Sequence, residues 1–496
     1  MHYRYLYDLL PSMMRIVIVL SLFGLLLSHS AVAQSSLGVR YLYPERLRED
    51  IEVLREAIHT AHPDPYRYRT KVELDLLIDS VSKALTVPLN EVDFTNAVRP
   101  VFKAIGDSHC YSDLATDLTD RMNKNALLIP LQLSLLPDGI YVESELKGFR
   151  SIPPGSRLLS INGRKVQEIM DQLIETVITD GANRSFAERT VEKEFPERYH
   201  VYFDGASSFN VEFLTPTGER DSKSIFGLTR EEINISRKPD GSLLPWAASW
   251  ISEYSTMWVT MNTLDAHEMA LVGQKPERFL DALLTDLLQN NASTVVLDLR
   301  GAGGRELAIA ELIFGAFAEQ PFKLLSDMYA RSATPPEIKA ERTMPVDLYA
   351  SNDGDWTTDA RGVYRLPVND PRLVENNPQQ KAFKGKVYVV ADGLTRDAAA
   401  SVVMLMRRTK RAKVVGEELG SNSFAFTGGE EWVVRAPNSR ILIHLPLLMY
   451  VPSGRGEGPN DRGEQPDHEA HQTPVALTKG QDSLKRSLLQ MIDFLR

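Results

Sequence analysis

Two segments of the chain constrain the fold more than any other feature, because each reads as a buried strand, a short turn and the start of a helix. The first is STVVLDLRGAGG, residues 293–304, and the second is KVYVVADGLTRDAAASVVMLM, residues 386–406. Apolar strands that alternate with helical patterns are typical of a mostly parallel sheet covered on both faces. From about Ser249 onward the sequence therefore predicts an α/β core, whose ligands should bind at the carboxyl ends of the strands.

Two parts with different patterns precede this core. Residues 34–126 show apolar side chains at helical spacing, as in PERLREDIEVLREAIHT, and predict a helical part. Residues 127–227 change to a period of two and predict a β-rich module with one helix, VQEIMDQLIETV. Within it, Asn162-Gly163 is suited to a type I′ hairpin turn. We assign the remaining residues, 228–496, to the α/β core, with a surface excursion near 346–380.

The N-terminus has the order of a secretory signal peptide. Arg15 is followed by an apolar run from Ile16 to Leu27 and then by Ala31-Val32-Ala33. The run is too short for a comfortable membrane span. We expect cleavage after Ala33 and export to the periplasm or the outside, with no stable membrane anchor after cleavage.

Composition narrows the classes of function. The 496 residues carry a formal net charge of −10, which argues against a nucleic-acid partner. The densest basic run, Arg407 to Lys413, is interpreted as the solvated end of a helix. Cys110 is the only cysteine, so an intramolecular disulfide is excluded and stability must come from packing. Nothing in the sequence calls for a cofactor or a metal, and the oligomeric state is left open.

Three local features could carry chemistry. Asp397 stands at the mouth of the helix in the second segment, where an α/β enzyme often presents a nucleophile. Gly303 and Gly304 end a turn whose N–H groups could approach a ligand closely. GDSHC, residues 106–110, places His109 at a turn that ends a helix. Each feature also has a structural interpretation: a capped helix, a tight turn and a core histidine.

Taken together, these features resemble the tail-specific or C-terminal-processing serine peptidases of family S41, and especially the exported, tricorn-core-like bacterial branch. The resemblance covers essentially the whole mature chain. GDSH is similar to the family's D-G-H-T, VVLDLRGAGG to I-D-L-R-x-N-x-G-G, and KVYVVADGLTRDAAA to the strand and elbow V-Y-V-L-x-x-x-x-T-x-S-A-A. PPGSRLLSINGRKVQEI resembles a PDZ-type module, RAKVVGEELGSNS resembles R-A-x-x-I-G-E-x-T-G-G, and GEQPDHEA resembles a terminal G-x-x-P-D. The resemblance implies an α/β fold with a ClpP/crotonase-like core, an N-terminal helical part, a PDZ-like β-rich module and a peptide or protein terminus as ligand.

Carried over by position, the resemblance implies His109 as general base, assisted by the hydroxyl of Ser108. Backbone N–H groups of Gly303 or Gly304 and of Ala398 would line the oxyanion hole. No lysine follows the elbow, so the histidine branch of the family matches better than the lysine branch. The resemblance also implies an orienting acid near the C-terminal motif, with three candidates left open: Glu457, Asn460 and Asp461.

The main departure from the family lies at the nucleophile itself. The family's serine falls on Asp397, and smaller departures occur at Ala302, Arg305, Leu419 and Ser421. A carboxylate is a weak nucleophile toward an amide, and it should form an ion pair with His109 that raises the pKa of the imidazole. We therefore expect a site that is weakly active or inactive as a peptidase.

Three hypotheses follow from this departure. The fold could bind peptides without cleaving them, or it could be an active hydrolase with a substitute nucleophile such as Ser401 or Cys110. The pair of Asp397 and His109 could also activate water or hold a metal. The cluster HEAH, residues 468–471, lacks the H-E-x-x-H spacing and is interpreted as a tail.

Overall fold

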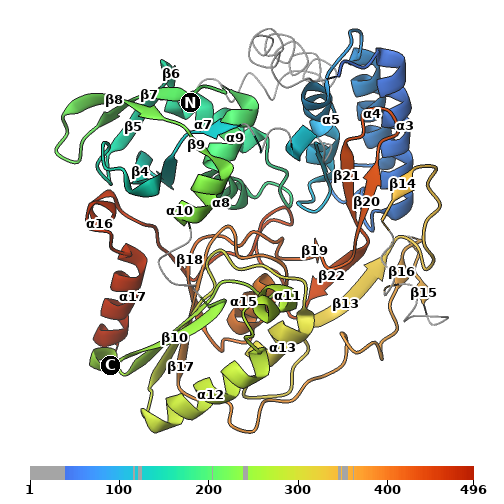
Figure 1. The fold of residues 1–496 in the computed structure, drawn as a ribbon. Coiled ribbons are helices and arrows are strands. Elements are labelled where there is room, and N and C mark those ends of the chain that lie inside the picture. The colour runs from blue at the N-terminus through green and yellow to red at the C-terminus, as the bar shows by residue number, and fades with distance from the viewer. Residues whose placement is uncertain are drawn as a thin grey trace, which may run out of the picture.

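The computed structural model describes residues 40–114, 118–120, 124, 126–203, 205–237, 244–343, 348, 356–360 and 362–495. The predicted signal peptide, residues 1–33, lies outside the described residues. Within the described part of the chain, no helix is both long and apolar enough to cross a membrane. Figure 1 shows three regions: N-terminal helices, a β-rich module beside them, and an α/β core below both.

The N-terminal region is helical, as predicted, and consists of three amphipathic helices, α3 (Pro44–Ala61), α4 (Lys71–Ala84) and α5 (Glu91–Ile105). Thr70 and Glu73 form a capping box at the start of α4. Gly106 ends α5 in the left-handed conformation, with φ 68°. The buried faces of these helices belong to the same hydrophobic cluster as the core. Strand β1 (Tyr111–Asp113) continues this connection by pairing with a core strand, β21 (Leu442–Pro446). The segment that carries His109 is therefore packed directly on the core.

The module is an antiparallel sheet in the order β3-β4-β5-β7-β8, with β6 paired to β5. Asn162 (φ 49°) and Gly163 (φ 78°) both lie in the left-handed region, which confirms the predicted type I′ turn. The prediction of a single helix was wrong, because two more helices follow it in a charged segment whose few apolar residues include Phe186, Val191 and Phe195. The elements are β3 (Leu131–Leu136), β4 (Gly139–Glu145), β5 (Arg157–Ile161), β6 (Arg164–Lys165), α7 (Val166–Glu175), α8 (Arg184–Lys193), α9 (Phe195–Tyr202), β7 (Ser208–Leu214) and β8 (Arg220–Phe226).

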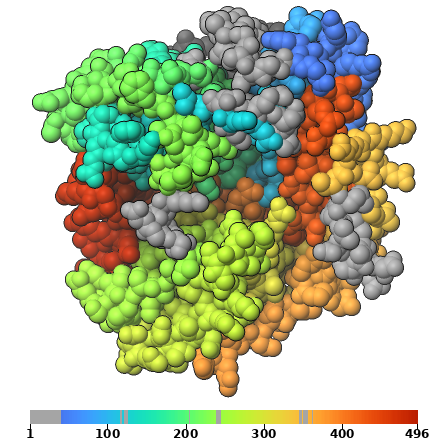
Figure 2. Space-filling model, in the orientation of Figure 1, coloured from blue at the N-terminus to red at the C-terminus, as the bar shows by residue number. Residues whose placement is uncertain are grey.

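A short ladder of β2 (Leu127–Leu128) and β9 (Leu228–Thr229), followed by α10 (Arg230–Arg237), closes the module. The space-filling view shows the module and the N-terminal helices above the core, with the C-terminal segment on one flank (Figure 2).

The core contains the predicted sheet, in the order β10-β11-β12-β17-β18-β23. All its pairings are parallel except β10 with β11. Alternate residues of these strands face two hydrophobic clusters on opposite sides of the sheet, as expected of a sheet covered on both faces. The strands are β10 (Trp246–Ile251), β11 (Thr256–Met261), β12 (Thr294–Asp298), β17 (Lys386–Ala391), β18 (Lys413–Gly416) and β23 (His468–Glu469).

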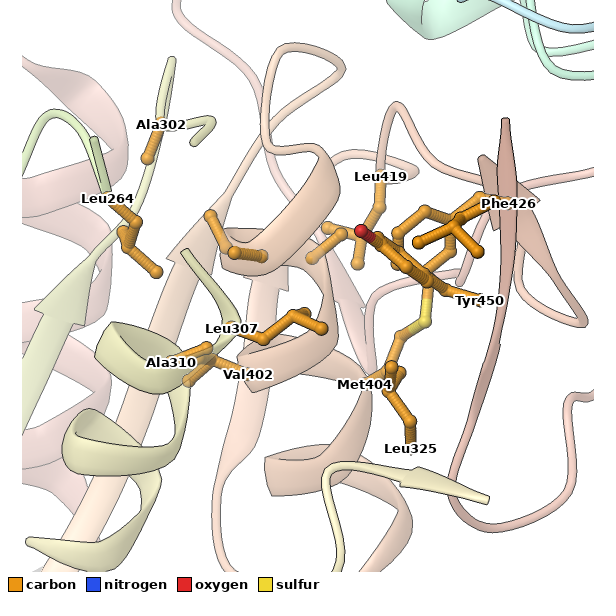
Figure 3. Packing of buried hydrophobic residues seen from close by; sticks show 14 of the residues in the cluster. Leu264, Ala302, Leu307, Ala310, Leu325, Val402, Met404, Leu419, Phe426 and Tyr450 are labelled. Atoms are coloured by element: carbon orange, nitrogen blue, oxygen red, sulfur yellow. The ribbon is translucent and has the colours of Figure 1, made fainter. Parts of the chain in front are cut away.

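Helices cover both faces of this sheet. One side carries α11 (Ala266–Leu271), α12 (Pro276–Gln289), α13 (Leu307–Gly315) and α15 (Asp397–Arg408), whose apolar residues belong to the large cluster. Figure 3 shows Val402 of α15 beside Leu307 and Ala310, and Met404 between Leu325 and Tyr450. The other side is covered by α17 (Ser483–Phe494), which α16 (Pro474–Thr478) precedes. Helix α15 is therefore held in the core along most of its length, which fixes the position of its first residue, Asp397.

Two antiparallel sheets extend the core beyond what the sequence predicted. Their orders are β1-β21-β20-β14 and β15-β16-β13-β22-β19. SRILIHLPLLMYVP reads as one apolar strand, but it forms β21 and β22 in different sheets, with Leu447 N–H donating to Glu430 between them. Part of the predicted excursion at 346–380 lies outside the described residues. The remaining strands are β13 (Leu325–Ala330), β14 (Glu341–Arg342), β15 (Thr357–Thr358), β16 (Tyr364–Arg365), β19 (Phe426–Thr427), β20 (Glu431–Arg435) and β22 (Leu448–Pro452).

Candidate active site

Asp397 occupies a tight turn between β17 and α15. Its φ of 57° places a residue with a Cβ in the left-handed region, which costs roughly 1–2 kcal/mol for a residue other than glycine. The turn is locked to the glycine turn after β12, because Arg396 N–H donates to Ala302 (3.0 Å) and Gly301 N–H donates to Asp392 (2.9 Å). A strained turn that presents one side chain at the start of a helix is the geometry of a nucleophile elbow.

His109 reaches this elbow from the turn that follows α5. Asp107 accepts a hydrogen bond from the N–H of His109 (2.9 Å), and Asp180 of the module accepts one from the N–H of Ser108 (2.8 Å). The second oxygen of Asp180 accepts from the N–H of Asn422, 3.1 Å away in the core. Three distant parts of the chain thus hold the histidine in place.

The imidazole of His109 and the carboxylate of Asp397 form an ion pair, with 3.1 Å between Nε2 and Oδ1. The other oxygen, Oδ2, accepts from Nε of Arg396 at 3.0 Å. Burial raises the pKa of Asp397, but the charges of Arg396 and His109 outweigh it and lower this pKa to about 2. Oδ1 receives no hydrogen bond of good geometry from a described residue. Asp397 is therefore an ionised carboxylate at neutral pH, paired with two cationic side chains.

The protonation of His109 follows from its neighbours. Burial and the charge of Arg396 lower its pKa, whereas the carboxylates of Asp397 and Asp107 raise it, and the net direction is upward. A guanidinium nitrogen of Arg396 also lies in close contact with Nε2. The imidazole is thus biased toward its charged form, which cannot accept a proton.

On its other side, His109 meets a chain of polar residues that sequence reasoning missed. Thr427 Oγ1 lies 3.1 Å from Nδ1 and donates to Asp107 at 2.6 Å. Asp107 in turn pairs with the buried His62 at 3.0 Å. Ser108, the predicted assistant, has its hydroxyl 3.5 Å from Nδ1, at the limit of a hydrogen bond. Asp107 belongs to the GDSHC motif and could have been found there, but no local signal pointed to Thr427.

The structure does not bring the expected orienting acids to His109. Glu457 pairs with Arg407 at 3.3 Å, Asn460 accepts from Asn422 through its backbone, and the backbone carbonyl of Asp461 accepts from Ala182. Asp107 is the carboxylate near Nδ1, at 3.9 Å. This geometry does not support an orienting acid from the C-terminal motif, because that loop is bound to helix α15, to Asn422 and to the module instead.

The three residues proposed for an oxyanion hole lie around Asp397. The N–H of Ala398 donates to the carbonyl of Gly304 at 3.2 Å, so this donor is engaged. A Cβ on Gly303 would lie 3.8 Å from Asp397 Oδ2, which puts this glycine beside the carboxylate. Gly304 must be glycine, since its φ is 136° and a Cβ would meet the carbonyl oxygen of Leu264 at 2.4 Å. Their role as oxyanion donors stays a prediction.

Neither substitute nucleophile reaches the site. Ser401 is fully buried, and its hydroxyl donates to the carbonyl of Asp397 one turn back along α15 (3.3 Å). Cys110 is buried in the main hydrophobic cluster, and burial raises the pKa of its thiol well above the ordinary value. Both side chains are packed in the interior.

Metal-ligating residues do not gather at this site or elsewhere in the described ranges. In the HEAH segment, His468 and Glu469 form the edge strand β23, and His471 lies between Glu417 (3.1 Å) and Glu469 (3.0 Å). This segment is an ion-pair cluster at the sheet edge rather than the tail predicted from the sequence.

The ion pair of His109 and Asp397 opens into a cavity of about 480 Å³. Its walls come from all three regions: the N-terminal helices, the module and the core. They include Tyr111, Phe186, Arg198, Arg305, Glu430 and Glu431. The site therefore has room for several residues of a ligand and presents both signs of charge.

Residues 259–470 match the model of peptidase family S41. This region contains β12, the elbow after β17 and the C-terminal motif. A search among curated proteins gives no match.

Solved structures of CPAF share the fold at low sequence identity. Mature CPAF complexed with lactacystin aligns with a TM-score of 0.64 and 12% identity over 91% of this chain and 99% of that one. The s499a mutant of CPAF gives a TM-score of 0.66 and 11% identity over 91% and 98%. The photosystem II D1 C-terminal processing protease gives 0.43 and 11% over 86% and 93%. At this identity the CPAF matches show the fold alone.

Proposed function

We propose that this chain is an exported, peptide-binding member of the S41 fold in which amide hydrolysis is lost or very weak. The observation that carries the proposal is the ion pair of Asp397 and His109 at the elbow. The match to a peptidase family supports a peptide or protein as ligand. The signal-peptide pattern at residues 1–33 supports the exported location.

The chemistry of the elbow supports the loss of hydrolysis. A serine peptidase needs a hydroxyl that gives its proton to a neutral imidazole as it attacks the carbonyl carbon. Asp397 has no proton to give, and attack by its carboxylate on an amide would form a mixed anhydride, which is less stable than the amide. His109 is biased toward the charged form by the same carboxylate. Loss of a triad nucleophile typically costs several orders of magnitude in kcat.

The cavity supports retained binding. Beside Asp397 it has a volume of about 480 Å³ and walls from all three regions. Polar side chains in its walls, such as Arg198 and Arg305, offer partners for backbone and terminal groups of a peptide.

The proposal is tested with the mature chain and a library of fluorescently labelled peptides. Binding is measured by fluorescence anisotropy and turnover by mass spectrometry of the same mixtures. We expect saturable binding without new termini. Cleavage that disappears in His109→Ala would contradict the loss of activity, and absence of binding by every peptide and by an unfolded protein such as casein would contradict the retained ligand class.

A further inference from the structure

Asp397 is not alone in closing the site. We propose that Arg396 is a second blocking residue: with a serine at position 397 and a neutral His109, its guanidinium would donate to the base nitrogen of His109 and keep the site closed. This inference rests on the proposed function, because it concerns the same site and explains what besides the nucleophile separates it from a working peptidase.

The contacts of Arg396 carry the inference. Its Nε donates to Asp397 Oδ2 at 3.0 Å, and its terminal nitrogen lies in close contact with His109 Nε2. Nε2 is the atom that would accept the proton of an attacking hydroxyl. A guanidinium offers only donors and stays protonated, so it competes for the lone pair that a general base must keep free.

Arg396 is also held independently of Asp397. Its guanidinium carbon lies 5.3 Å from the ring centre of Phe186, a cation–π contact with helix α8 of the module. Its backbone N–H donates to Ala302 at 3.0 Å. Replacement of Asp397 removes one of these contacts and leaves the others. The guanidinium should therefore stay near the histidine in a variant that has only the serine restored.

The aliphatic stem of Arg396 covers the glycine turn as well. A Cβ added to Gly303 would lie 3.5 Å from Cγ of Arg396. The stem therefore runs beside this glycine, one of the predicted oxyanion donors. A substrate carbonyl that approached Gly303 from this side would meet the stem. The Arg396 side chain thus lies next to both His109 and the proposed oxyanion site.

Four proteins distinguish the effect of Asp397 from the effect of Arg396: wild type, Arg396→Met, Asp397→Ser and the double variant. Methionine keeps an unbranched stem and removes the charge and the fork of donors. Labelling by a fluorophosphonate is measured by intact mass and mapped by peptide digestion. Wild type and Arg396→Met, which have no serine at position 397, give the background.

We expect slow labelling of position 397 in Asp397→Ser and labelling at least about tenfold faster in the double variant, since a cation next to an imidazole shifts its pKa by about a unit or more. The pH at half-maximal rate should also be higher in the double variant, because removal of a neighbouring cation raises the pKa of His109. Equal rates and equal pH profiles in the two variants would overturn the inference, and so would the absence of labelling in both.

A second measurement covers the case in which the double variant does not fold. In Arg396→Met with Asp397 intact, NMR should show the pKa of His109 higher than in wild type, and an unchanged pKa would overturn the inference. Neither result depends on peptide turnover by the wild type, so failure of this inference is distinguishable from failure of the proposed function.

Discussion

At the scale of single residues, Asp397 combines the backbone geometry of an elbow with the side chain of a weak nucleophile. The elbow geometry fits a nucleophile, since φ is 57° and the side chain faces the cavity. The side chain itself is a carboxylate bound by Arg396 and His109. The turn thus has the backbone strain of an elbow together with a side chain that is a weak nucleophile toward an amide.

This strain gives a prediction about stability. Asp397→Gly and Asp397→Ala both remove the carboxylate, but only glycine adopts a φ of 57° without steric cost. We expect the glycine variant to be more stable than the alanine variant by roughly 1 kcal/mol, measured by urea unfolding. Equal stability, or a more stable alanine variant, would mean that the turn relaxes and stores no strain.

The sequence predicted some of these residues and not others, for physical reasons. His109 and Asp397 were predicted together because each stands in a recognisable motif, and the structure places them 3.1 Å apart. Thr427 was missed because it lies 318 residues from His109 in the chain and belongs to a two-residue strand without a pattern of its own. The blocking position of Arg396 depends on side-chain direction, which no spacing encodes.

At the scale of elements, strand β19 and the turn after α5 are joined through one hydroxyl. Thr427 Oγ1 donates to the buried Asp107 and lies 3.1 Å from His109 Nδ1. Thr427→Val keeps the shape and removes the hydroxyl, so Asp107 loses a buried hydrogen bond. We expect a loss of about 1–2 kcal/mol in the free energy of unfolding.

Thr427→Ser is the matched control, because it keeps the hydroxyl and removes only a methyl group. Urea unfolding of both variants decides whether the hydrogen bond or the packing matters. A serine variant as unstable as the valine variant would assign the effect to the lost methyl group or to rearrangement of the strand.

A glycine in the module tests the connection between module and core. Gly181 has a φ of 61°, and a Cβ there would lie 2.4 Å from the carbonyl oxygen of Asp461. Gly163 has a similar φ of 78° with nothing within 4 Å of its Cβ position. Both alanine variants carry backbone strain, but only Gly181→Ala adds a clash between module and core.

We therefore expect Gly181→Ala to lower the free energy of unfolding by roughly 1–3 kcal/mol more than Gly163→Ala does. Thermal unfolding monitored by circular dichroism measures the difference. A similar loss in both variants would show that the contact between module and core adapts without cost.

At the scale of the whole molecule, the parallel part of the fold could be predicted from the sequence and the antiparallel part could not. Strands β12 and β17 are continuous apolar runs followed by helices, and this pattern has few interpretations. The run that forms β21 and β22 is equally apolar, but its division between two sheets depends on partners such as β20 and β13. Pairing of this kind is a long-range property that local periodicity does not contain.

The C-terminal helix lies beyond the residues that match the family model, yet it covers one face of the central sheet. Leu488 of α17 is 2% exposed and belongs to a cluster with Val296 and Tyr388. We expect Leu488→Ala to cost about 2–5 kcal/mol in unfolding free energy. Phe494→Ala, at a position 89% exposed, should change it by less than about 0.5 kcal/mol. A small effect at Leu488 would mean that α17 contributes little to the stability of the sheet.

The proposed function depends on control of the charge of His109 by the carboxylate of Asp397. An NMR pH titration of His109 in wild type and Asp397→Asn tests it most directly. In wild type the carboxylate raises the pKa of His109 above its ordinary value. In the variant, burial and Arg396 remain and both lower it, so the pKa should fall by about 1–3 units. The same pKa in both proteins would contradict the ion pair and, with it, this explanation of the changed elbow.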